Sequence, residues 1–277
     1  MRRGESGRGC GCGGRAALRP AVARPSGRSR TLLLALVLAS GAAHAGGSEA
    51  DPLAGAWALY REGAMTAAAT AARRQDGPDG LALAARATLI EALYQAPAAA
   101  RRSLVERALG DAREALALAP DHYGGHLQLV LALGTLATLE GPISAHLKGH
   151  AREGRMLLEQ ARALAPPGDP WPDGLLGIWH LQAVHAGSPA LALELYGASA
   201  AQGLALCRRA AAEAPRVLAL RYGCAVSMLD LDPAGLGAEA RAELAALVAL
   251  PAADAAERLV QGAARRRVAE VSRRAVR

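Results

Sequence analysis

The sequence predicts an all-α protein built from antiparallel helical hairpins in series. Three observations support this fold class: the composition, the scarcity of strand-like runs, and a short amphipathic stretch that recurs and ends in Ala-Pro. The chain is rich in Ala and Leu, has no Phe, and is only 3% aromatic. Ala and Leu are strong helix formers, and the β-branched or aromatic runs that are typical of strands are nearly absent.

The recurring stretch indicates a repeat architecture. It closes at Pro120, Pro166 and Pro215, and a weaker copy closes at Pro251, so that successive copies are 46, 49 and 36 residues apart. Each copy follows a second, more apolar helical stretch. A period in this range indicates an array of supersecondary units, in which neighbouring hairpins stack and share one continuous core because none can bury its apolar face alone.

Residues 1–45 are predicted to be a secretory signal peptide. Arginines precede an apolar run over 31–43, which is followed by the small-residue pattern Ala43-His44-Ala45. This is the layout of a cleaved signal, and the run is shorter than the roughly 20 residues that span a bilayer. We therefore expect export across the inner membrane to the periplasm, with no transmembrane span in the mature chain.

The charge distribution argues against a nucleic-acid partner. Residues 1–45 hold eight arginines and one glutamate, which accounts for the whole net charge of +7 and leaves 24 basic and 24 acidic residues in the remainder. The mature part is therefore neutral. A local basic tail follows residue 264, and it either contacts anionic lipid headgroups or is a solvated helix end favoured by the helix dipole.

The mature chain divides into three predicted parts: a short polar lead (46–52), a helical repeat region (53–251), and a C-terminal helix with the basic tail (252–277). Helices are predicted over 53–74, 81–95, 103–119, 123–139, 152–165, 171–186, 217–229 and 239–250. The stretch 189–215 is one helix or a pair, with Ser188-Pro189 at its start, and 143–149 is a connection. Small residues are expected to allow close helix approach at Ala112, Gly134, Ala161, Gly177, Ala210 and Gly223.

Two passages resemble tetratricopeptide repeats. The Leu-Ala-Pro closure at Pro120, followed by Asp121, looks like the end of such a repeat, and 166–177 resembles the passage into the next one, with Gly177 near the expected glycine of helix A. The resemblance covers roughly 53–250, although the spacing exceeds the usual period of about 34 residues. It implies a right-handed solenoid that binds partners and does not catalyse a reaction.

A second resemblance concerns a narrower group. Gly141-Pro-Ile143, Lys148-Gly149, Arg152-Glu153 and Gly177-Ile-Trp-His180 are similar to segments of divergent exported bacterial repeat proteins. That group is similar to the periplasmic T-component of tripartite (TRAP) transporters. This resemblance implies an alternative function, as a solute-binding accessory subunit of a periplasmic transporter.

The sequence contains no complete catalytic or metal-binding pattern. His146 and His150 are four residues apart, a spacing used for metal ligands on a helix, but Gly149 interrupts the segment and the metalloprotease glutamate is missing. His180 and His185 are poorly spaced for one helix. A His-based metallohydrolase is therefore a remote alternative, and we expect no enzymatic activity, no cofactor and no metal.

Cys207 and Cys224 are the cysteines of the mature chain, since Cys10 and Cys12 fall within the predicted signal peptide. They lie seventeen positions apart on successive predicted helices. In an oxidising compartment they could form a bridge across a hairpin. Two small buried residues are an equally good interpretation, and the sequence leaves both open.

The candidate binding residues are polar or aromatic side chains that interrupt the first helix of each hairpin. In stacked hairpins this helix lines the concave side. The residues are Tyr123, His126, Gln128, Trp179, His180, Gln182, Arg221 and Tyr222. The competing interpretation is that Trp179 is a core anchor and the others lie at the rim. We expect a protein or peptide partner, and the sequence also allows a homo-oligomer.

Overall fold

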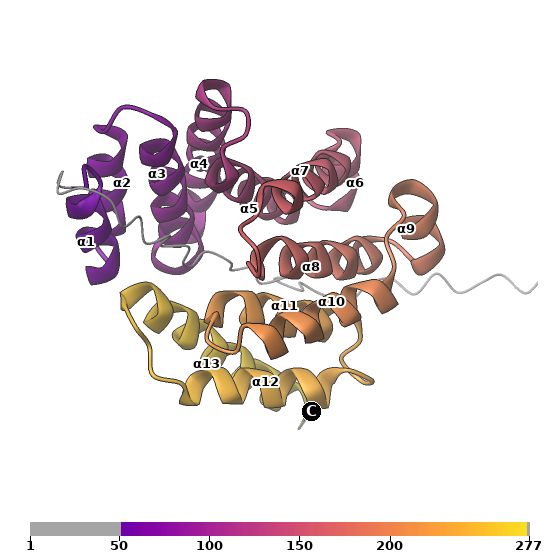
Figure 1. Ribbon diagram of the computed structural model, residues 1–277. Coiled ribbons are helices and arrows are strands. Elements are labelled where there is room, and N and C mark those ends of the chain that lie inside the picture. Colours follow the sequence, from indigo (N-terminus) through magenta and orange to yellow (C-terminus); the bar gives the residue numbers. More distant parts are fainter. Residues whose placement is uncertain (1–50, 276–277) are drawn as a thin grey trace, which may run out of the picture. The chain divides into compact units, whose positions relative to one another are not determined.

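The computed structural model describes residues 51–275, so the predicted signal peptide and most of the polar lead lie outside the described residues (Figure 1). Within this range the chain forms α-helices and one short π-helix, with no strand. The N-terminal elements are α1 (Ala54–Glu62), α2 (Met65–Arg73), α3 (Pro78–Ile90), η1 (Glu91–Gln95), α4 (Ala98–Leu118), α5 (Tyr123–Glu140) and α6 (Pro142–Leu147). The C-terminal elements are α7 (His150–Leu164), α8 (Trp171–Ala186), α9 (Pro189–Tyr196), α10 (Ala200–Glu213), α11 (Leu218–Leu231), α12 (Gly237–Ala249) and α13 (Ala255–Ala275).

Several helix starts follow from local chemistry. The Ser188 hydroxyl accepts a hydrogen bond from the Leu191 backbone N–H at 3.2 Å, and Pro189 occupies the first helical position of α9. His122 caps α5 in the same manner, since its Nδ1 accepts from the Gly125 N–H at 2.9 Å. Side-chain acceptors at this position satisfy backbone donors that have no partner within the helix. The predicted start at Ser188-Pro189 is confirmed.

Two predicted elements are wrong in their extent, and one that the sequence left open is settled. The single helix over 53–74 is two helices, because Gly63 adopts a φ of 91° and ends α1. The connection over 143–149 contains α6, which begins at Pro142 between Gly141 and Gly149, both at positive φ. The stretch 189–215, predicted as one helix or a pair, is a pair, α9 and α10, bent by 83°. Glycine reaches positive φ at no steric cost, and it therefore ends a helix readily.

Helices that are neighbours in sequence pack on one another and share a core. α3 packs on α4, α4 on α5, and α5 on α7; further along, α8 packs on α10, α11 on α12, and α12 on α13. Most of their buried apolar side chains form one cluster from Leu53 to Ala264, and Val184 of α8 belongs to a smaller one with Ala192 and Ala198. α13 also contacts α1, where a Cβ on Gly63 would lie 2.9 Å from the Cβ of Ala255.

The contacts between the first helices of neighbouring hairpins differ in how closely the helices pack. α3 packs along α5, and α8 packs along α11, whereas α5 and α8 meet at few positions. We call the last two contacts the α8–α11 junction and the α5–α8 junction. The first is tightly filled and the second is open, and this difference positions the candidate site.

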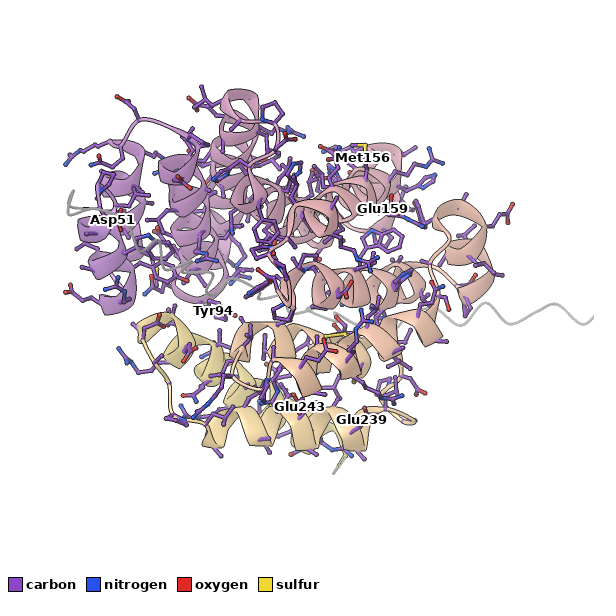
Figure 2. The ribbon with its side chains drawn as sticks, viewed as in Figure 1. Asp51, Tyr94, Met156, Glu159, Glu239 and Glu243 are labelled. Atoms are coloured by element: carbon purple, nitrogen blue, oxygen red, sulfur yellow. A yellow bond between two sulfur atoms is a disulfide. The ribbon has the colours of Figure 1, made fainter. Side chains whose placement is uncertain are left out.

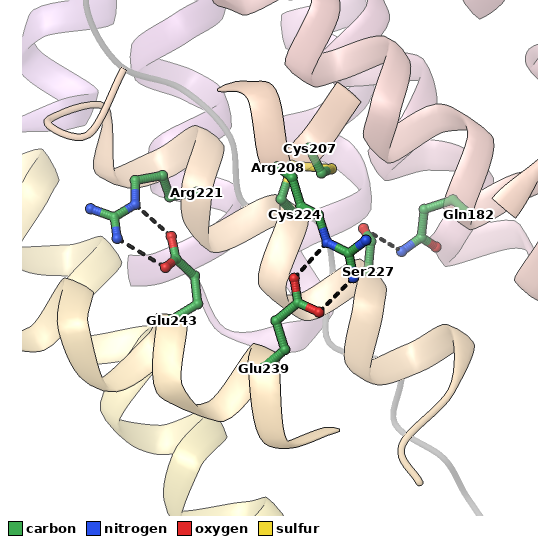
Figure 3. Close-up of a disulfide and its surroundings, with 8 residues drawn as sticks. All are labelled: Gln182, Cys207, Arg208, Arg221, Cys224, Ser227, Glu239 and Glu243. Carbon is green, nitrogen blue, oxygen red and sulfur yellow. Dashed lines mark hydrogen bonds and ion pairs between the residues drawn. A yellow bond between two sulfur atoms is a disulfide. The ribbon is translucent and has the colours of Figure 1, made fainter. Parts of the chain in front are cut away.

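Glycines let α8 pack closely on α10 and α11, and a disulfide ties α10 to α11 beside the α8–α11 junction (Figure 3 shows the disulfide). A Cβ on Gly174 would lie 2.6 Å from Leu220, and one on Gly177 would lie 3.0 Å from the backbone nitrogen of Cys207. Cys207 and Cys224, whose pairing the sequence left open, are joined by a disulfide that links α10 to α11. Both are buried, at 1% and 3% exposed.

Polar contacts extend from this junction to α12 and α13. Gln182 donates to Ser227 at 3.0 Å, and Arg221 and Arg208 each pair with a glutamate of α12 (Figure 3). On α13, Arg267 is 6% exposed and forms a buried ion pair with Asp230 of α11. The interpretation of the basic tail as wholly solvated is therefore wrong for Arg267, because it neutralises a buried carboxylate.

No helix within residues 51–275 is long and apolar enough by itself to cross a membrane, although α9 and α10 pass that test when taken together as a bent pair.

Candidate functional site

A cavity of about 290 Å³ lies at the α5–α8 junction. Its walls are apolar, with Leu133 and Ala137 from α5 and Leu175 and Ile178 from α8. α6, the start of α7 and the last residue of α9, Tyr196, complete the lining. Among the described residues that line it there is no Asp, Glu, Lys or Arg. We call this space the α5–α8 cavity.

Two glycines leave the space for the cavity. A Cβ on Gly134, in the middle of α5, would have no atom within 4 Å, and one on Gly154 of α7 would first meet Trp179 at 3.8 Å. The prediction that Gly134 allows close helix approach is wrong, because no neighbouring helix reaches it. Gly177, in contrast, lies where a neighbouring helix does approach closely, as predicted.

A buried carboxylate holds the junction of α5, α6 and α7 together. Glu140 has a side chain only 5% exposed and accepts from Lys148 Nζ at 2.5 Å and from His150 Nε2 at 3.1 Å. The hydrogen bond from Lys148 is the main reason that the pKa of Glu140 falls to about 2, and that from His150 contributes. Glu140 is therefore ionised at physiological pH, and it fixes the position of His150 at the cavity.

The two histidines that the sequence paired by spacing have different partners. His150 bonds to Glu140, whereas His146 Nδ1 shares a short hydrogen bond with the hydroxyl of Tyr196 and so links α6 to α9. The two imidazoles therefore do not share a binding partner. Nowhere in the part of the chain that the structure describes do three His, Cys, Asp or Glu side chains meet in a way that could hold a metal ion.

Trp179 lies between the cavity and α7. Its indole N–H donates to the carbonyl of Ala151 at 2.9 Å, and the Arg155 guanidinium lies 5.7 Å from the centre of its ring. Arg155 also donates to the carbonyl of Tyr196. Trp179 is therefore both a wall of the cavity and a packing residue that ties α8 to α7.

The structure brings only two of the eight candidate binding residues to the cavity, Trp179 and Gln182. Four others are interior residues, at 5%, 3%, 5% and 1% exposed, namely His126, Gln128, His180 and Tyr222. These four side chains face neighbouring helices and do not form an open face.

Two of them, His126 and His180, have hydrogen-bond partners inside the protein, whereas Gln128 Oε1 and His126 Nδ1 are buried without one. His126 Nε2 shares a hydrogen bond with the carbonyl of Pro120 at 2.8 Å, and His180 Nδ1 accepts from the Ser199 N–H at 3.2 Å. Burial is the main cause of a lowered pKa for His180, and it raises the pKa of Tyr123. Arg221, on α11, pairs with Glu243 of α12.

The lining residues that the sequence did not single out as site residues include Gly134, His185 and Tyr196. Gly134 carried a signal, since a glycine in an otherwise apolar helix costs stability without a reason in packing. Tyr196 carried none, because its role depends on the bend between α9 and α10. The sequence pattern presents His185 only as one of two poorly spaced metal ligands.

Exposed apolar side chains are concentrated on the helices around the cavity. Among the described residues, large apolar side chains are exposed at six positions, and five of them lie on α6, α7 and α9 (Figure 2 labels Met156). We call these five the apolar rim: Ile143, Leu147, Met156, Leu191 and Leu193. Ile143 and Leu147 are the most exposed, at 79% and 80%. The sixth is Leu118 on α4.

Comparison with known proteins identifies the fold. No protein-family model matches the chain, and no curated protein matches it. A solved structure, that of a thermophilic TPR protein of Thermus thermophilus, is similar, with a TM-score of 0.52 and 23% identity. The likeness covers 79% of this chain and 96% of that one. It confirms the all-α, tetratricopeptide-like fold predicted from the sequence, while the resemblance to transporter T-components stays a prediction.

Proposed function

We propose that the chain is an exported, non-enzymatic helical-repeat scaffold that binds another protein through its apolar rim. The observation that carries this proposal is the concentration of exposed Ile, Leu and Met side chains on α6, α7 and α9. Burying one such side chain contributes roughly 1.5–3 kcal/mol, and exposed apolar groups that gather in one region mark interaction sites.

The fold and the cysteines support two parts of the proposal. Stacked helical hairpins present extended surfaces that such proteins use for binding. The buried disulfide between Cys207 and Cys224 suits an oxidising compartment, as export to the periplasm would provide. The apolar side chains that remain exposed suit a partner whose own contact surface is apolar.

The test is affinity capture from intact periplasm with three versions of the tagged full chain: wild type, Ile143→Asp/Leu147→Asp, and Leu118→Asp. We expect a stoichiometric partner, or a second copy of the chain, with wild type and with Leu118→Asp. The α6 variant should lose it, because a carboxylate at a contact excludes apolar neighbours. Light scattering on the purified chain separates self-association from a foreign partner.

Either of two results would contradict the proposal. One is a wild-type chain that recovers no partner and is monomeric. The other is equal capture by the α6 variant and by Leu118→Asp. Leu118 is a suitable control because it is 59% exposed and lies on α4, away from the cavity.

The cavity favours a second candidate, the solute-binding accessory subunit of a transporter. A concave apolar space bordered by a few polar groups is the usual form of a small-molecule site. A thermal-shift screen separates the two candidates, because a small ligand raises the melting temperature only if it binds the folded chain.

A further inference from the structure

We propose that the α5–α8 cavity binds a medium-chain aliphatic carboxylic acid, with its hydrocarbon chain between α5 and α8 and its carboxylate at the mouth. This names the ligand class for the second candidate function. It is independent of protein binding at the apolar rim, because the rim and the cavity use different side chains.

The lining determines what can enter. Leu133, Ala137, Leu175 and Ile178 present only hydrocarbon, and no described lining residue is Asp, Glu, Lys or Arg. A charged or polyhydroxylated solute would lose its hydration there and gain too few hydrogen bonds in return. The inserted part of the ligand is therefore an uncharged hydrocarbon group.

The volume limits the length and number of chains. The space of about 290 Å³ lies at the lower end of the range of about 300–1,000 Å³ that small-molecule sites occupy. It therefore suits one hydrocarbon chain of medium length better than the paired, longer acyl chains of a membrane phospholipid.

The mouth suits an acidic head group. His146 and His185 both line the cavity and are exposed to solvent. The imidazole of His185, and Nε2 of His146, whose Nδ1 is bonded to Tyr196, can each donate an N–H to a carboxylate. The nearby carboxylate, Glu140, is engaged by Lys148 and His150 and so does not repel an anionic ligand strongly.

The experiment measures decanoate binding to the full chain by isothermal titration calorimetry, with wild type, Gly134→Leu and Gly110→Leu. Both glycines are exposed in the middle of a helix, and at both a Cβ would have no atom within 4 Å, but only Gly134 lines the cavity. We expect wild type and Gly110→Leu to bind alike. Gly134→Leu should lose about tenfold or more in affinity, as for misfit methyl groups in a hydrophobic pocket.

Two further ligands define the class. Decanol lacks the carboxylate and should bind more weakly than decanoate, and phosphatidylglycerol vesicles should not bind in preference to it. Far-UV circular dichroism checks that each variant is folded, and Ala137→Leu, which also fills the cavity, replaces Gly134→Leu if the latter does not fold.

Several outcomes would overturn the proposal. These are no decanoate binding by wild type, equal binding by the cavity-filling variant and Gly110→Leu, or a preference for the vesicles. Decanol that binds as tightly as decanoate would overturn the assignment of the carboxylate. Because the apolar rim is unchanged in these variants, loss of decanoate binding with retained protein capture separates this inference from the scaffold proposal.

Discussion

The α8–α11 and α5–α8 junctions occupy equivalent places in the fold and have opposite packing. Each joins the inner helices of two successive hairpins, and each contains glycine. At the first, Gly174 and Gly177 are close to side-chain or backbone atoms of the adjoining helices, and a disulfide joins α10 to α11. At the second, Gly134 has open space in front of it and the cavity fills the gap.

The difference shows that a glycine in a helix has two structural uses. It can admit a neighbouring helix to close contact, or it can leave a space for a ligand. The sequence alone does not distinguish these two uses, because Gly134 and Gly177 both stand in apolar helices. What separates them is the course of the chain within two hairpins: α6 lies between α5 and α7, α9 lies between α8 and α10, and both short helices line the open junction.

The largest effect on stability is expected at the buried ion pair between α11 and α13, next to the tightly packed α8–α11 junction. Asp230→Ala removes the buried partner of Arg267 and leaves it with Glu270, at 3.6 Å on the same helix; loss of one member of a buried ion pair costs about 3–5 kcal/mol. Urea unfolding measures this loss. As a control, Glu106→Ala removes the exposed pair with Arg102 and should cost no more than about 1 kcal/mol. Equal effects of the two changes would show that the Asp230 pair is not needed to hold α11 to α13.

The disulfide should contribute somewhat less. Its two cysteines are 17 residues apart, and closing a loop of about that length stabilises a fold by about 3 kcal/mol. The double variant Cys207→Ser/Cys224→Ser should therefore unfold at a lower urea concentration than wild type. Dithiothreitol should shift the wild-type midpoint in the same direction and leave that of the variant unchanged. Identical midpoints without reductant would contradict the prediction.

A matched pair of glycine substitutions tests the comparison directly. Gly177→Ala places a methyl group 3.0 Å from backbone and should destabilise by about 1–3 kcal/mol through overpacking. Gly134→Ala meets nothing and should stabilise by up to about 1 kcal/mol, since alanine is the better helix former. Urea midpoints give the sign of each change. If both changes have the same sign, the packing of α8 on α10 and the packing of α5 on α8 do not differ as described.

A further effect, which depends on pH, concerns acid stability at the open junction. The pKa of Glu140 is lowered to about 2, so its contribution to stability is complete above its ordinary value of 4.5 and is lost as the pH falls towards 2. Glu140→Gln removes this contribution at neutral pH and should flatten the loss of stability between pH 5 and pH 2.5. Urea midpoints across that range measure how stability changes with pH. Parallel curves for wild type and Glu140→Gln would refute the prediction.

The sequence predicted the fold well because its signals are local. Helix propensity, the Ala-Pro closures and the cap at Ser188 each act over a few residues, and α8 begins and ends where the apolar run predicts. Gly63 and Gly141 are of the residue type that commonly ends a helix. Whether a particular glycine takes a positive φ, however, depends on what packs around it. The helix in 142–147 was missed for this reason.

The site was predicted less well because it depends on distant contacts. Trp179 and Gln182 were found from their polarity on an apolar helix, but His126 and Tyr222 have the same pattern and are interior residues. Tyr196 reaches His146 across fifty residues of sequence. No periodicity encodes such a contact, and the exposure of Ile143 and Leu147 followed only from where α6 lies.

The contact of α13 with α1 has a consequence for how the chain folds. In an open array the terminal repeats touch one neighbour each and fray first. Here α1 and α13, the first and last helices of the described residues, contact each other, so separating either one exposes part of the other. Contacts between segments so far apart in sequence raise the contact order, which slows folding. The described part of the chain should therefore unfold as one cooperative unit and refold more slowly than an open repeat array of the same length.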